Sequence, residues 1–199
     1  PLPRMRLVEI KPFIRFSMAV FANGLVNYVN TTLDLLLGGR LLDSSSFGLY
    51  SVPRNLVLQL QFLFNPVFTR VGFPVFAAIQ DDRQRTTNVY LKMMNMTASV
   101  NAPLYLGIAF FSPVLVTLLL GENWREASGI LRLLAIWGFI RSLSNPVGSL
   151  LLGMGRADIS FRWNIALLLL MPPILWLGSM QGVVGLVWSL LLLAMLMFV

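Results

Sequence analysis

The sequence predicts an all-α, polytopic membrane protein built as a bundle of six transmembrane helices. Hydrophobic residues make up 57% of the chain and charged residues only 12%, about half the charged share that is usual in soluble domains. No charged residue occurs between Arg162 and the last residue, Val199. Short polar connectors divide the chain into apolar segments, and short connectors are typical of antiparallel neighbours in one bundle.

Six apolar segments follow one another along the chain. Each is read as a helix because a membrane-spanning backbone must satisfy its own hydrogen bonds. The uncharged tail is too long for one crossing, which takes about 20 residues, and it suits two crossings that turn at residues 178–182. The second and third segments exceed the bilayer thickness, so we expect their inner ends to project into the cytoplasm. The predicted helices are 13–38, 47–79, 90–120, 128–152, 160–177 and 183–199.

Prolines inside these segments each remove a backbone donor and favour a kink. The kinks serve either helix packing or bends that take part in gating, and the sequence leaves both readings open. These prolines are Pro66, Pro103, Pro146 and the pair Pro172 and Pro173.

Lysine and arginine are distributed unevenly over the two sides of the predicted bundle. The positive-inside rule places the richer side in the cytoplasm. We therefore expect a basic cytoplasmic segment at 1–12 and a six-helix transmembrane domain at 13–199, with both ends of the chain toward the cytoplasm. Neither end resembles a natural terminus, so the chain is interpreted as a fragment truncated at both ends. The poorer side holds Arg40 and Arg125, and the richer side holds Arg4, Arg6, Lys11, Arg15, Arg83, Arg85, Lys92, Arg156 and Arg162.

The net charge of +7 does not indicate a nucleic-acid partner. The cations lie at the ends of apolar segments, where they act as topology signals and contact lipid headgroups. The chain contains no Cys and no His, which removes thiolate metal sites and the commonest general base. We therefore expect no metal site and no cofactor.

The first predicted helix carries polar residues on a single face. Asn23, Asn27, Asn30 and Asp34 follow one another at spacings of four, three and four residues, which stacks them along one side of a helix. A polar stripe inside a bilayer faces either water or protein. The stripe is therefore either the wall of a hydrated path or a seam of interhelical hydrogen bonds, and the sequence does not decide between them.

The second predicted helix offers a matching face, because Arg54, Gln61 and Asn65 are separated by seven and four residues. Arg54 either extends toward the headgroups or points inward to attract an anion. Asp34 either pairs with an arginine or binds a coupling cation.

The fourth predicted helix places Arg141 close to its midpoint, with Asn145 one turn farther on. A mid-bilayer arginine is a functional-site candidate that either pairs with a carboxylate or receives an anionic substrate. Arg132 lies on nearly the opposite face and is interpreted as interfacial. Asp34 is the one carboxylate expected inside the membrane, so the chain offers no intramembrane acid–base pair, and we expect no enzyme activity.

Three groups of motifs together resemble Wzx-type polysaccharide exporters of the multidrug/oligosaccharidyl-lipid/polysaccharide flippase superfamily, and the resemblance is greatest to the colanic acid exporter subgroup. They span about residues 13–164. The first group contains Asn27-Tyr28 and Gly38-Gly39-Arg40, the second contains Asn65-Pro66-Val67 and Phe73-Pro74-Val75, and the third contains Asn145-Pro146-Val147-Gly148 with Gly155-Arg156-Ala157-Asp158.

The resemblance implies the second of two six-helix lobes around a central cavity in a bacterial inner membrane. Its cargo would be an undecaprenyl-pyrophosphate-linked oligosaccharide, moved by alternating access, with membrane lipids and other polysaccharide-assembly proteins as partners. A proton or sodium ion for coupling stays open. On this reading Arg141 and Arg54 attract the pyrophosphate, and the Asn23, Asn27, Asn30, Gln61 and Asn65 face binds the sugar. The alternatives are an exporter of peptidoglycan precursors or drugs, a membrane-embedded polysaccharide polymerase, and a scaffold subunit.

Overall fold

A computed structural model describes the backbone of residues 7–198 and the side chains of residues 17–18, 20–63, 66 and 70–197. Within these residues every regular element is helical, which confirms the all-α prediction. The helices are α1 (Leu7–Leu41), α2 (Ser44–Ala78), α3 (Arg83–Phe110), α4 (Ser112–Leu120), the short 3₁₀ helix η1 (Glu122–Trp124), α5 (Ala127–Leu143), α6 (Asn145–Gly153), α7 (Ala157–Ser179) and α8 (Gly182–Phe198).

Two of the predicted segments are broken rather than continuous. The predicted helix 90–120 is divided into α3 and α4, which are bent by 76° relative to each other. The predicted helix 128–152 is divided into α5 and α6 at Ser144. Pro113 and Pro146 each lie in the first turn of the second helix. Proline suits this position because its missing N–H has no intrahelical partner there. The prolines therefore begin new helices instead of only kinking one.

Two aspartates fix the beginnings of long helices. The Asp43 carboxylate accepts a hydrogen bond from the backbone N–H of Ser46 at 3.1 Å, before α2. Asp82 accepts one from the N–H of Arg85 at 2.9 Å, before α3. Each bond satisfies a donor that the first helical turn leaves without a partner. The connectors of the bundle can therefore be short.

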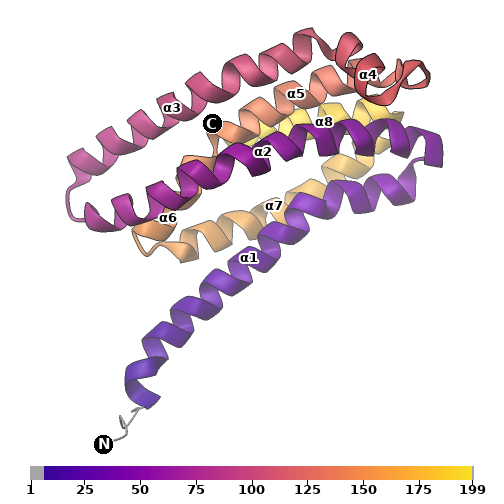
Figure 1. Ribbon diagram of the computed structural model, residues 1–199. Coiled ribbons are helices and arrows are strands. Elements are labelled where there is room, and N and C mark those ends of the chain that lie inside the picture. Colours follow the sequence, from indigo (N-terminus) through magenta and orange to yellow (C-terminus); the bar gives the residue numbers. More distant parts are fainter. Residues whose placement is uncertain (1–6, 199) are drawn as a thin grey trace, which may run out of the picture.

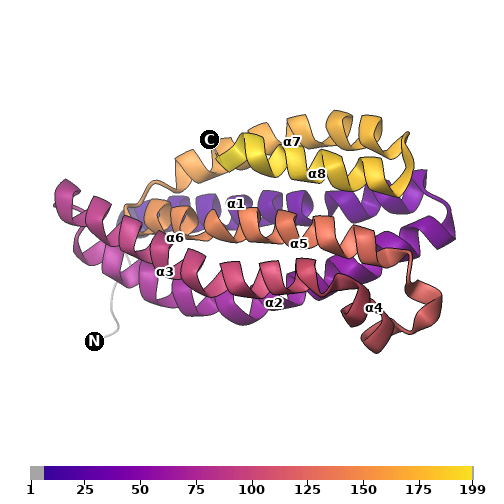
Figure 2. The same ribbon diagram turned by 90° about the horizontal axis from the view of Figure 1, so that it is seen from above.

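The centre of the bundle is α5, which packs against α2, α3 and α8, while α1 packs mainly against α7 and α2 packs against α6. Figure 2 shows α7 and α8 on one side of the bundle, α2 and α3 on the other, and α5 between them. The buried apolar core follows this arrangement. It includes Tyr50, Val57, Leu131, Leu134, Leu175 and Leu186.

We call the end of the bundle with residues 42–43 and 121–126 the distal end, and the end with residues 79–82 and 154–156 the proximal end. At the distal end α1 and α2 meet through their short connector, and α1 then diverges from α2 toward the proximal end (Figure 1). The polar residues of α1 accordingly meet different neighbours along the helix.

The outer face of α7 and α8 is apolar. Large side chains at Leu169, Trp176, Val184, Trp188 and Leu192 are about half exposed or more, as expected of a surface in contact with lipid. By length and composition, two segments are able to cross a membrane: α5 and α6 taken together, and α7. The bent pair of α3 and α4 provides a third span if the pair is counted as one. Six crossings therefore remain a prediction, and the membrane character is confirmed.

Candidate functional site

Two asparagines of α1 bind α7. Asn23 Nδ2 donates to Ser160 Oγ at 3.1 Å, and its Oδ1 accepts from Asn164 Nδ2 at 2.8 Å. About two turns farther along α1, the Asn30 side-chain amide donates to the Asn164 backbone carbonyl at 2.8 Å. At these two positions the polar stripe of α1 is therefore a seam of interhelical hydrogen bonds, which is one of the two interpretations that the sequence left open.

Asn27 lies between these asparagines on the same face, yet its side chain is exposed. The face is covered by α7 at Asn23 and Asn30, and by α2 at Asp34. The positions on either side of Asn27 bind α7, but the Asn27 side chain itself is left exposed. Its amide is therefore available to a molecule that reaches this face.

Asp34 joins α1 to α2 through a buried ion pair with Arg54. The guanidinium binds the carboxylate through both Nε and Nη2, with Nη2 at 2.7 Å from Oδ1. Arg54 Nη2 also donates to the Thr31 carbonyl, and the Tyr50 hydroxyl donates to Asp34 Oδ2. Asp34 is 2% exposed and Arg54 is 3% exposed. We call Asp34, Arg54 and Tyr50 the distal clasp.

The distal clasp contains two of the predicted site residues, Asp34 and Arg54. Asp34 was expected either to pair with an arginine or to bind a coupling cation, and in the structure it pairs with Arg54. Arg54 is turned inward, as one reading expected, but its charge is compensated by the carboxylate. Among the described residues this is the one salt bridge. In this state the charge of Arg54 is compensated, because both carboxylate oxygens accept from its Nε and Nη2 groups.

Gln61 lies at the meeting of three helices. Its amide donates to the Gly138 carbonyl of α5 at 3.1 Å, and the Tyr105 hydroxyl of α3 donates to the Val57 carbonyl of α2 at 3.4 Å. A Cβ atom added at Gly138 would lie 2.5 Å from Val57 Cγ1 and 2.8 Å from Tyr105 Cε1. Only glycine permits this close approach. The Asn65 side chain lies outside the described residues.

Arg141 forms no salt bridge among the described residues, and it differs from the other described arginines without one because they are exposed and it is partly buried. It lies in the last turn of α5 and is partly buried, and its Cζ atom lies 5.2 Å from the centre of the buried Trp137 ring. A cation over an aromatic face at this distance is attracted by the ring but keeps its full charge. Asn145 follows the break between α5 and α6, and its Nδ2 atom is buried without a partner among the described residues. Arg132 is exposed and donates to the Ala109 carbonyl at 3.3 Å.

Sequence reasoning missed three side chains that complete these contacts: Tyr50, Ser160 and Asn164. The spacing of four between Ser160 and Asn164 signals one polar helix face, so both were accessible to the same reasoning that found the stripe on α1. Tyr50 carried no such signal, because a lone tyrosine near a helix start is common. In the part of the chain that the structure describes, no group of three metal-ligand side chains gathers.

Comparison with known proteins identifies the chain's relatives. Residues 1–129 match the family described as polysaccharide biosynthesis protein. The chain is 36% identical over 180 residues to the lipopolysaccharide biosynthesis protein WzxC of Escherichia coli K12, a match that covers 90% of this chain and 37% of the relative. It is 37% identical over 161 residues to the teichuronic acid biosynthesis protein TuaB of Bacillus subtilis 168, with 81% and 33% covered.

A more distant relative is the succinoglycan biosynthesis transport protein ExoT of Rhizobium meliloti 1021, which is 24% identical over 160 residues and covers 80% of this chain and 32% of the relative. The chain thus spans little more than a third of the length of the curated relatives it matches. No solved structure matches it significantly. The matches confirm the resemblance that the motifs predicted.

Proposed function

This chain belongs to the polysaccharide biosynthesis protein family, and we propose that it forms part of a transporter that exports an undecaprenyl-pyrophosphate-linked oligosaccharide by alternating access. The proposal is supported by relatives named for polysaccharide biosynthesis and for transport. It places the transporter in the bacterial plasma membrane with both ends of this chain toward the cytoplasm. Other polysaccharide-assembly proteins are its expected partners.

The observation that carries the proposal is the uncompensated charge of Arg141. A guanidinium inside an apolar bundle is costly unless an anion or water approaches it. A pyrophosphate presents several acceptor oxygens, which a guanidinium binds through its paired donors more strongly than it binds neutral groups. Arg141 is held at its place by the ring of Trp137, so its charge is available without a large rearrangement.

The other residues of the predicted substrate path fall into two groups, according to whether their side chains already form hydrogen bonds within the protein. Asn27 is exposed and Asn145 keeps an unpaired amide, so we assign these two, with Asn65, to hydrogen bonds with sugar hydroxyls. The remaining members of the substrate path hold the helices that border it. These are Asn23, Asn30, Asp34, Arg54 and Gln61.

Charge reversal at Arg141 in the full-length protein tests the proposal. Arg141→Glu should abolish surface polysaccharide while the amount of protein in the membrane stays unchanged, and Arg141→Lys should retain partial export. Arg132→Glu is the matched control, because Arg132 lies on the same helix but is exposed. Normal export by the Arg141→Glu variant would refute the role of this residue.

A further inference from the structure

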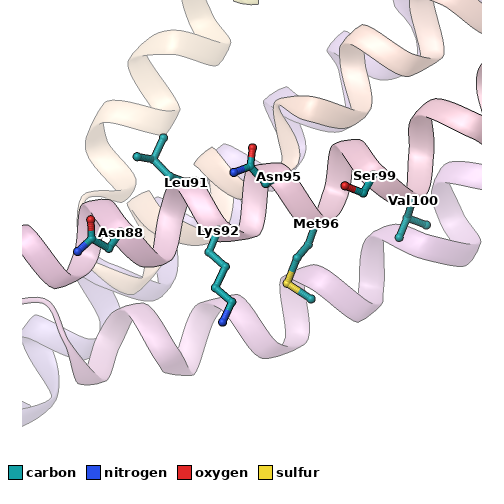
Figure 3. A pocket seen from close by; sticks show the side chains of 7 residues that line it. All are labelled: Asn88, Leu91, Lys92, Asn95, Met96, Ser99 and Val100. Carbon is teal, nitrogen blue, oxygen red and sulfur yellow. The ribbon is translucent and has the colours of Figure 1, made fainter.

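A shallow, open groove lies on the surface of α3 and shares no residue with the candidate site. It has a volume of about 590 Å³ and is lined by Asn88, Leu91, Lys92, Asn95, Met96, Ser99 and Val100. Its polar members follow one another at spacings of four, three and four residues, so they share one helix face. Figure 3 shows Lys92 and Met96 along one edge of this face and Leu91 and Asn95 along the other edge.

The groove lies where the exposed surface of α3 changes from polar to apolar. Between Arg83 and Ser99 most of the exposed side chains are charged or polar, whereas the exposed residues that follow are Val100, Pro103, Leu106 and Phe110. Such a change along a membrane helix marks the level at which headgroups give way to hydrocarbon. The groove therefore opens at headgroup level.

The chemistry of the lining selects the ligand. The lining supplies an ammonium group, two carboxamides and a hydroxyl, and it contains no carboxylate. The exposed Arg83 and Arg85 in the first turn of the same helix are balanced by the exposed Asp81 and Asp82 beside them, so the positive charge of the groove is that of Lys92. These groups match an anion with several acceptor oxygens. Leu91, Met96 and Val100 match an attached acyl chain.

We propose that this groove binds the phosphate of an anionic glycerophospholipid in the leaflet at the proximal end of the bundle. Lys92 binds the phosphate oxygens as a point charge, while its methylene stem lies along the apolar lining. Asn88, Asn95 and Ser99 donate to the remaining oxygens of the headgroup. The site shares no residue with the proposed transport path, so its test does not depend on the identity of the exported cargo.

Retention of phosphatidylglycerol by the full-length protein tests the proposal. Native mass spectrometry of protein taken from vesicles of phosphatidylglycerol and phosphatidylcholine should show selective retention of the anionic lipid. Lys92→Gln should lower that retention about fivefold, since a basic residue near an anionic surface contributes on the order of 1 kcal/mol. Asn95→Leu should also lower it, but by less, because it removes a neutral donor and leaves the lysine in place.

Two controls keep the test decisive. Lys92→Arg should retain the lipid, which shows that charge rather than an altered fold is responsible, and Arg125→Gln at the distal end should behave as wild type. Equal retention by wild type and Lys92→Gln would overturn the proposal. Displacement of phosphatidylglycerol by undecaprenyl phosphate at equimolar concentration would also overturn it, because the groove would then belong to the cargo lipid.

Discussion

Removing one member of the distal clasp should destabilise the protein far more than removing a surface ion pair. An exposed pair contributes about 0–1 kcal/mol, but Asp34 and Arg54 are 2% and 3% exposed. Asp34→Leu leaves the guanidinium buried without its carboxylate, which should cost about 3–5 kcal/mol. Tyr50→Phe removes one hydrogen bond to a charged acceptor and should cost about 1.5–3 kcal/mol.

The double variant Asp34→Leu with Arg54→Met distinguishes pairing from packing. Both charges are then gone, so the double variant should be clearly less destabilised than the sum of the two single losses, although the Tyr50 hydroxyl still loses its acceptor. The measurement is chemical unfolding of the full-length protein in detergent micelles, followed by tryptophan fluorescence. If the two single losses simply add in the double variant, the two residues are not coupled and the reasoning is wrong.

Two further predictions concern the helix ends and helix contacts. Gly178→Ala should destabilise the packing of α7 against α8 by about 1–3 kcal/mol, because the new Cβ would lie 1.7 Å from Ser189 Oγ. Gly148→Ala is the control, because its new Cβ meets nothing within 4 Å. Equal melting temperatures of the two variants would contradict this packing. Hydrogen bonds from Ser45 and Ser46 hold the pKa of Asp43 well below its ordinary value. The stability contributed by the ionised Asp43 carboxylate is complete above the pKa that Asp43 has in the unfolded chain, and it is lost as the pH falls through the pKa of Asp43 in the folded protein. The melting temperatures of wild type and Asp43→Ala should therefore converge only in strong acid. A difference that is independent of pH would show that the charge of Asp43 is not the cause.

The helices were predictable from the sequence, but their breaks were not. Apolar segments between charged connectors predicted six helical regions, and the structure has helices in all six. Pro113 and Pro146 mark the breaks, yet proline in a membrane helix is compatible with either a kink or a new start. The 76° bend between α3 and α4 is visible only once the helices are placed.

The partners of the candidate residues were predictable only in part. Spacing along α1 correctly placed Asn23, Asn30 and Asp34 on one face. Spacing along a single helix cannot tell which neighbour covers that face, and α7 lies more than 130 positions away in the chain from the asparagines that it binds. For the same reason the pairing of Asp34 with Arg54 stayed one of two alternatives until the helices were placed.

Aqueous access to the open position on α1 tests the central claim most directly. The chain contains no cysteine, so Asn27→Cys and Leu192→Cys each introduce a single thiol here, in a full-length protein from which any cysteine elsewhere has been removed. Leu192 lies on the apolar outer face of α8 and is 54% exposed. A membrane-impermeant maleimide should label the Asn27→Cys protein and leave the Leu192→Cys protein unlabelled. If both thiols resist the reagent in every state of the transporter, the face of α1 meets lipid or protein rather than water, and the proposed transport path does not exist.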